Sequence, residues 1–196
     1  MADASLRERK KQKTREALEE AAIRLFLEKG YSGTSIEDIA SEAEVSRRTF
    51  FRYFGSKEGV IFADADQQGA AMVQALLAQP RDVPPLNAYR DAIVALSQVV
   101  ASDQEAILAK QKVVMNTFEL RTRASEIARQ WRGRFAETLA TRAGRDQPDE
   151  SDGILAGVAI AVLTAAIEDW VAAGGRDDLI ERLRRAFDVV CEEPSG

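Results

Sequence analysis

The most constraining feature of the sequence is the stretch from Thr34 to Lys57, which has the pattern of two short amphipathic helices joined by a tight turn. In its first half, apolar residues recur at i, i+3, i+4 and i+7, so they share one face of a helix. Ser46 then caps a second helix, in which Phe50 and Phe54 lie four residues apart and point inward. The stretch therefore predicts a helix-turn-helix.

The outward surface of the second helix has an unusual composition for a solvated face. It combines three guanidinium groups with two aromatic rings and a hydroxyl. An arginine donates a bidentate pair of hydrogen bonds to guanine edges and also contacts phosphates, so this surface suits the major groove of DNA. The expected outward residues are Arg47, Arg48, Thr49, Phe51, Arg52 and Tyr53.

At these residues the chain resembles the TetR family of bacterial transcriptional regulators. The resemblance implies an all-α protein of about nine helices. In it, an N-terminal three-helix helix-turn-helix domain precedes a C-terminal helical domain for ligand binding and dimerisation. It also implies double-stranded operator DNA as a partner. The residues that match the family pattern, position by position or nearly so, are Gly33, Thr34, Ser35, Ile39, Ala40, Val45, Ser46, Thr49, Phe50, Phe51, Tyr53, Phe54 and Lys57.

Three residues depart from the family pattern. Glu44 stands where the family usually has glycine, and a left-handed backbone there costs about 1 kcal/mol. Phe51 replaces the usual tyrosine, so a phenolic hydrogen bond to DNA is lost and apolar contact remains. Tyr53 replaces a common histidine. These differences change the DNA sequence that we expect to be bound rather than the mode of binding.

Two hydroxyls precede the first helix of the motif. Either Thr34 with Glu37 or Ser35 with Asp38 forms a capping box, and the sequence does not choose between them. The resemblance implies that the hydroxyl left over reaches a DNA phosphate. Lys57 lies in the first turn of the next helix, where a cation opposes the helix dipole, and a phosphate bound there resolves the conflict. We therefore expect Thr34, Ser35, Ser46 and Lys57 to contact DNA as well.

The charge distribution places the basic end of the chain at this motif. The net charge is -5, yet residues 1–57 carry twelve Lys and Arg against ten Asp and Glu, whereas residues 58–196 carry fifteen against twenty-two. The acidic remainder discourages contact with DNA. We therefore assign residues 1–57 to a basic arm and DNA-binding domain, and residues 58–196 to ligand binding and dimerisation.

Residues 1–13 are polar and rich in Lys and Arg. They fit either a disordered tail or a flexible arm that follows the DNA backbone or minor groove. Ser102 with Glu105 forms a capping box, and the polar segment 144–149 is the expected mobile loop. Apolar periodicity predicts helices at about 14–29, 56–79, 86–101, 103–115, 119–143, 150–173 and 177–191.

Cysteine and histidine usage excludes several kinds of site. Cys191 is the one cysteine and there is no histidine, so an intramolecular disulfide and a Cys/His metal site are ruled out. We expect no metal, no cofactor and no enzymatic activity. The N-terminus lacks the apolar core of a signal peptide, and the apolar run Gly153–Ile167 is shorter than the about 20 residues that span a membrane. These features favour a cytoplasmic protein without a membrane partner.

The run Gly153–Ile167 is apolar on nearly every side, so both its sides need a cover. We expect the rest of the subunit to supply one cover and a second copy the other, in a homodimer through about 150–191. The alternative is a helix buried within a monomer. A dimer presents two recognition helices to half-sites about 34 Å apart, so the operator is expected to be an imperfect palindrome.

Several large apolar residues are expected to surround the centre of the second domain. They fit either an ordinary core or an apolar ligand cavity with a polar anchor such as Gln111. The order of segments from Leu86 on is similar to a TetR C-terminal domain of the acyl-CoA-like ligand-binding type, which implies a small apolar effector such as a fatty acyl-CoA. The expected lining residues are Met72, Gln111, Met115, Phe118, Trp131 and Phe135.

A second class of function competes with this hypothesis, namely a small all-α enzyme or carrier for an apolar ligand. Against it, the sequence has no histidine, no nucleophile motif and no Gly-rich phosphate loop beside a strand. Arg47, Arg48 and Arg52 discriminate between the two hypotheses, because only a DNA-binding protein needs them for its function.

Overall fold

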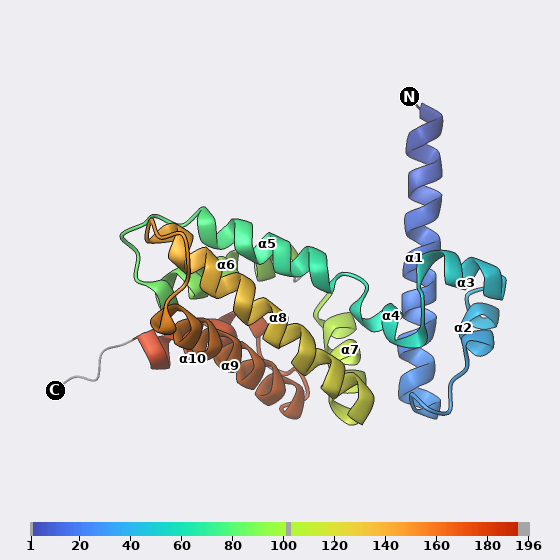
Figure 1. Cartoon of the computed structure of the whole chain (residues 1–196). Coiled ribbons are helices and arrows are strands. Elements are labelled where there is room, and N and C mark those ends of the chain that lie inside the picture. Colours follow the sequence, from blue (N-terminus) through green and yellow to red (C-terminus); the bar gives the residue numbers. More distant parts are fainter. Residues whose placement is uncertain (1, 101–102, 192–196) are drawn as a thin grey trace. The chain divides into compact units, whose positions relative to one another are not determined.

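The computed structural model describes residues 2–100 and 103–191, and this part of the chain is all-α, as expected (Figure 1). Side chains are described for residues 7–97 and 103–191. The helices are α1 (Ala2–Lys29), α2 (Ile36–Glu42), α3 (Arg47–Tyr53), α4 (Lys57–Phe62), α5 (Ala65–Leu77), α6 (Pro85–Val100), α7 (Gln104–Asn116), α8 (Phe118–Arg142), α9 (Glu150–Ala172) and α10 (Leu179–Cys191).

The chain folds into two compact units. Unit 1 contains the chain up to Ala63 together with residues 112–120, and unit 2 contains residues 64–111 and the chain from Arg121 on. Unit 1 is thus larger than the expected domain of residues 1–57. It includes all of α4, the end of α7 and the start of α8. No local feature of the sequence indicates this, because residues 112–120 join unit 1 through contacts that are distant along the chain.

Helix α1 begins far earlier than expected. Residues 2–13 are helical rather than a disordered tail or a flexible arm. Lys, Arg, Glu and Gln are strong helix formers, and neither Gly nor Pro interrupts them here. The side-chain pairs Glu8–Lys11 and Gln12–Glu16 lie on the surface at helical spacing and add to helix stability.

The core of unit 1 forms where α1 packs against α2 and α4. Leu18, Ala22 and Leu25 of α1 are almost fully buried, and they share one face of the helix because their spacings are four and three residues. Gly30 follows α1 with a φ of 77°, a left-handed conformation that glycine adopts readily and that ends the helix.

The single helix expected over about 56–79 is two helices, α4 and α5. The chain leaves the helical path at Ala63 and Asp64, where neither glycine nor proline is present. Ser56 caps α4 by accepting a hydrogen bond from the Gly59 amide at 3.0 Å, as its position suggested. Asp64 precedes α5 without making a side-chain cap. The break coincides with the boundary between the two units.

Unit 2 is a bundle in which α6 packs against α5, α9 and α10, and α9 packs against α10. Its largest fully buried side chains include Tyr89, Trp170 and Phe187. The indole of Trp170 donates a hydrogen bond to the Asp177 carbonyl oxygen at 2.8 Å, which satisfies its buried N–H group. The expected cap residue Ser102 lies outside the described residues. The Asp103 carboxylate accepts from the Ala106 amide at 2.9 Å.

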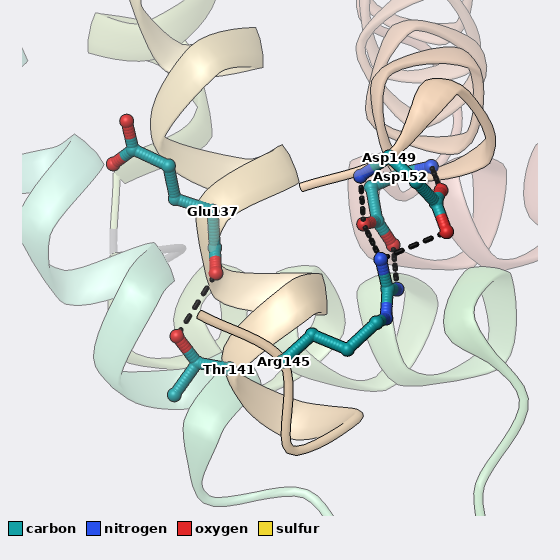
Figure 2. Close-up of polar contacts among 5 residues, drawn as sticks. All are labelled: Glu137, Thr141, Arg145, Asp149 and Asp152. Atoms are coloured by element: carbon teal, nitrogen blue, oxygen red, sulfur yellow. Dashed lines mark hydrogen bonds and ion pairs between the residues drawn. The ribbon is translucent and has the colours of Figure 1, made fainter. Parts of the chain in front are cut away.

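The connection between α8 and α9 is held by ion pairs, although its sequence predicted a mobile loop (Figure 2). Asp149 caps α9, and Asp149 and Asp152 form a reciprocal capping box. The Arg145 guanidinium contacts both carboxylates at 2.8 Å. Earlier along α8, the Thr141 hydroxyl donates to the Glu137 carbonyl oxygen at 3.0 Å. Hydrogen bonding by Arg145 lowers the pKa of Asp152, so this nearly buried carboxylate stays ionised.

Arg142 holds the connection between α5 and α6. Its side chain is buried, and its guanidinium donates to the carbonyl oxygens of Leu76, Gln79 and Pro80 at 2.6 to 2.8 Å. Carbonyl groups at the end of a helix lack partners within the helix, and a guanidinium supplies several donors at once. The apolar periodicity of α8 gives no sign of this role.

Candidate DNA-binding surface and ligand cavity

The turn between α2 and α3 has the left-handed residue that the sequence comparison anticipated. Glu44 has a φ of 53°. In the described part of the chain it is the one residue other than glycine with a positive φ. The amide of Val45 closes the turn by donating to the Ala40 carbonyl oxygen at 2.9 Å. Glycine would adopt this conformation without a steric penalty, so Glu44 is strained.

Of the two open capping boxes, the structure has Ser35 with Asp38. The Ser35 hydroxyl accepts from the Asp38 amide at 3.0 Å, and the Asp38 carboxylate accepts from the Ser35 amide at 2.9 Å. The Ser35 hydroxyl also donates to the Asp38 carboxylate at 2.7 Å, and this bond, followed by the one from the Ser35 amide, lowers the pKa of Asp38. Thr34 is buried instead, with its hydroxyl within 3.2 Å of two backbone carbonyl oxygens, those of Leu25 and Gly30. Thr34 therefore presents no hydroxyl at the surface, contrary to the role expected from the resemblance.

Helix α3 is anchored by its two phenylalanines. Phe50 and Phe54 are 0% and 3% exposed, and their ring centroids lie 5.8 Å apart. Ser46 caps the helix by accepting from the Thr49 amide at 3.1 Å. The guanidinium of Arg15 on α1 lies over the Phe54 ring at 5.8 Å. These contacts fix α3 against the rest of unit 1 and determine which of its faces points outward.

The opposite face of α3 presents basic and aromatic groups to solvent. Arg47, Arg48 and Arg52 are exposed, and Phe51 is 45% exposed. The Arg47 guanidinium forms an ion pair with Glu37 at 3.0 Å and lies over the Phe51 ring at 5.5 Å. Both members of the ion pair remain more than half exposed, and such pairs contribute only about 0–1 kcal/mol. Arg47 is therefore accessible to another partner.

The other two outward residues are less exposed. Thr49 and Tyr53 are half-buried. The Thr49 hydroxyl lies 3.0 Å from that of Ser46, and the Arg52 guanidinium lies over the Tyr53 ring at 5.3 Å. The outward surface of α3 thus pairs two guanidinium groups with two aromatic rings, Arg47 with Phe51 and Arg52 with Tyr53.

Lys57 has internal partners that the sequence did not indicate. Its ammonium donates to the carbonyl oxygens of Tyr31 and Thr34 at 2.8 and 2.7 Å and lies 4.5 Å from the centroid of the Tyr31 ring. These contacts explain a cation in the first turn of α4 without a phosphate. Burial and the negative charge of Glu58 raise the pKa of Tyr31. Lys57 therefore ties the α1–α2 connection to α4.

Unit 2 contains an apolar cavity of about 140 Å³ among α5, α6, α8 and α9. Three expected ligand residues, Met72, Trp131 and Phe135, line it. The other three do not. Gln111 is half-buried outside it, whereas Met115 and Phe118 belong to unit 1, and Phe118 is 72% exposed. The remaining lining residues are Gln68, Tyr89, Ile93, Leu96, Ser97, Ala159, Ile160 and Leu163.

Two further residues shape the cavity and were not anticipated from the sequence. A Cβ atom on Gly69 would lie 2.7 Å from the indole nitrogen of Trp131, so only glycine allows α5 to approach this ring. The Tyr89 ring lies 5.7 Å from that of Phe135, and burial raises the pKa of its hydroxyl. Both residues follow the ordinary apolar spacing of a helix, which does not separate a cavity wall from a packed core.

Comparison with known proteins identifies both parts of the chain. Residues 18–63 match the family described as bacterial regulatory proteins, tetR family, and residues 83–194 match the MftR C-terminal domain. The transcriptional regulator TcmR of Streptomyces glaucescens is 33% identical over 190 residues, covering 93% of this chain and 83% of TcmR. MftR of Mycobacterium tuberculosis is named as a transcriptional regulator of mycofactocin biosynthesis. It is 30% identical over 186 residues, which cover 93% of this chain and 91% of MftR.

Solved structures share the fold. One is NalD, the secondary repressor of the MexAB-OprM multidrug efflux pump of Pseudomonas aeruginosa. Its structure matches with a TM-score of 0.66 and 25% identity, and the match covers 92% of this chain and 96% of the NalD chain. Thermus thermophilus FadR, solved in complex with lauroyl-CoA, matches with a TM-score of 0.54 and 24% identity over 93% and 98%. The relatives are regulators rather than enzymes, and the chain belongs to the TetR family of DNA-binding transcriptional regulators.

Proposed function

We propose that this protein is a cytoplasmic homodimeric repressor that binds a palindromic operator through α3 and is released by a small apolar effector bound in unit 2. The observation that carries the DNA-binding surface is the exposed face of α3, where Arg47, Arg48 and Arg52 flank Phe51. A short helix of this kind fits the major groove with guanidinium groups directed at base edges and phosphates.

Ser46, Thr49 and Tyr53 complete the proposed surface on α3, and Ser35, the exposed N-cap of α2, is a further proposed DNA contact. Thr34 and Lys57 are left out, because their polar groups are bonded inside unit 1. They position the α1–α2 connection instead.

Helix α1 extends the proposed surface. At 100° per residue, Arg7 and Lys11 fall on the face of α1 that carries Leu18 and Leu25 farther along. That is the face on which α1 packs against the rest of unit 1. These two basic side chains of the extension thus lie on the side of α1 that carries the helix-turn-helix. We assign them to phosphate contacts beside the α3 site, made by a helix rather than by the disordered tail or flexible arm that the sequence left open.

The proposed dimer interface is built on α9 and α10. Helix α9 has the length and hydropathy of a membrane-spanning helix, so the length of its apolar run does not by itself exclude a membrane. Only 22% of the most apolar 18-residue stretch of α9 is buried within the chain. Ile154 and Ala161 of α9 and Val189 of α10 are exposed. A second copy covers this face and places two α3 helices on one operator.

The effector is assigned to the cavity of unit 2. A ligand that binds the DNA-incompetent arrangement more tightly than the competent one shifts the population toward release. Helix α8 supplies Trp131 and Phe135 to the cavity, and its first residues belong to unit 1. The same helix therefore reaches both the ligand site and the DNA-binding unit. FadR in complex with lauroyl-CoA makes a fatty acyl thioester the first ligand class to compare.

Selection of bound fragments from a random DNA pool tests this proposal. The expected result is enrichment of an imperfect palindrome. Replacing Arg47, Arg48 and Arg52 by Ala should lower affinity for the selected site at least about 100-fold, since each base or phosphate contact contributes about 1–3 kcal/mol. The matched control replaces Arg129 and Arg132, exposed on α8. Unchanged binding by the triple variant would refute the proposed surface.

A further inference from the structure

The size of the cavity in unit 2 restricts what it holds. Its volume is about 140 Å³. An engineered protein cavity of roughly 150 Å³, lined by similar apolar side chains, stays dry and binds benzene. One six-membered ring therefore fills this cavity. A lauroyl chain has twice as many carbon atoms as benzene and needs about twice that volume by the same comparison.

The lining of the cavity restricts the charge of its ligand. Among the lining side chains that the structure describes, none is Lys, Arg, Asp or Glu. Tyr89 is their one ionisable member, and burial keeps its hydroxyl protonated. An ion buried here without a partner of opposite charge would pay a large desolvation penalty. Carboxylates and phosphates are thus unfavourable inside the cavity itself.

The polar groups of the cavity are unevenly placed. Gln68 is exposed and Ser97 is half-buried, so both have access to water. Tyr89 is 0% exposed, and its hydroxyl has no hydrogen-bond partner among the described residues. Leaving such a group unpaired is unfavourable, and a ligand with one matching polar group removes this cost on binding.

We propose that the cavity binds an uncharged, single-ring molecule bearing one hydroxyl or carbonyl group, which pairs with the Tyr89 hydroxyl while the ring contacts Trp131 and Phe135. The inference rests on the proposed function, because it names the chemical class of the effector. It replaces the acyl-CoA class suggested by the sequence resemblance.

Calorimetric titration of the full chain with four probes tests the class. The probes are p-cresol, toluene, benzoate and lauroyl-CoA. The expected result is that p-cresol binds more tightly than toluene, and that benzoate and lauroyl-CoA do not compete with p-cresol. Tighter binding of benzoate or lauroyl-CoA, or no binding of either uncharged ring, would overturn the inference.

The variant Tyr89→Phe tests the hydrogen bond. It keeps the ring and removes the hydroxyl, so it should weaken p-cresol about five- to tenfold and leave toluene unchanged. Tyr31→Phe removes a hydroxyl from unit 1 and serves as the matched control. An equal loss of affinity for p-cresol and toluene would show that Tyr89 contributes only packing, and would contradict the proposal.

Operator binding separates this inference from the proposed function. p-Cresol at saturation should lower the affinity of the protein for its selected operator, and Tyr89→Phe should require more p-cresol for the same effect. If the protein binds its operator through α3 but does not bind uncharged rings, only the ligand class is refuted. Failure to select any operator would refute the proposed function, whatever the cavity binds.

Discussion

At the scale of single residues, Glu44 combines two unfavourable features in the turn before α3. Its backbone is left-handed, and its carboxylate adds negative charge near the proposed DNA surface. Replacing it by Gly removes the steric strain of about 1–2 kcal/mol, less the entropy that glycine loses on folding, about 0.5–1 kcal/mol. Glu44→Gly should therefore raise the free energy of unfolding by roughly 0.5–1 kcal/mol, as measured by urea denaturation.

Glu44→Ala provides the control for this variant. It removes the same charge and keeps a side chain in the left-handed conformation, so its stability should not rise. Both variants should bind operator DNA more tightly at low salt if the carboxylate repels phosphates. A gain in stability for Ala as large as that for Gly would contradict the strain argument.

The outward face of α3 was predictable because it follows from helical spacing. Once Phe50 and Phe54 point inward, Arg48 and Arg52 have to point outward, because they fall on the opposite face of the helix. Thr34 and Lys57 were not predictable in this way. Their partners are backbone carbonyl groups brought close by the fold, up to 26 residues away for Lys57, and carbonyl groups leave no trace in a sequence pattern.

At the scale of elements, the Arg145 cluster that joins α8 to α9 predicts a pH-dependent stability. The pKa of Asp152 is lowered mainly by hydrogen bonding to Arg145. A carboxylate with a depressed folded-state pKa stabilises the fold above its unfolded value of about 3.9, and this contribution is lost as pH falls through the folded value. Arg145→Gln should therefore lower stability at pH 7, and the difference from the parent should shrink below about pH 4.

Urea denaturation at pH 7, 5 and 3 measures this difference. Arg123→Gln is the matched control, because Arg123 pairs with Glu126 at 2.9 Å on the surface of α8 and both side chains are at least 40% exposed. Its effect should be small at every pH. A destabilisation by Arg145→Gln that stays constant down to pH 3 would show that ionised Asp152 is not its source.

Most helices were predictable from apolar periodicity, whereas their ends were less so. The α4–α5 break at Asp64 contains no glycine or proline, so no local signal marks it. The early start of α1 was missed for the opposite reason. Its first residues are helix formers without an apolar face, and such segments also occur in disordered tails.

At the scale of the whole molecule, the uncovered face of α9 predicts an obligate partner copy. Ala161→Arg places a charge on an exposed position of a single chain, so it should leave the fold intact and block the approach of a second copy. Light scattering should then report a monomer. Operator affinity should fall about 100-fold or more, because the two half-sites are no longer bound together.

Leu77→Arg is the control for this variant. Leu77 is 41% exposed on α5, away from α9 and α10 in the sequence, so its replacement should not change the oligomeric state. A dimer that survives Ala161→Arg would move the interface elsewhere. The domain division expected from the motif and the charge difference stays a prediction, and no sequence signal marks residues 112–120 as part of unit 1.

The membership of residues 112–120 in unit 1 has a practical consequence for truncation. A fragment ending at Ala63 would lack Val113, Val114 and Leu120, which are buried. Such a fragment would expose the apolar surface that these residues cover, so it should be less stable than unit 1 is in the full chain. A chimera that joins the DNA-binding part of unit 1 to another ligand-binding domain therefore needs to include residues 112–120 as well.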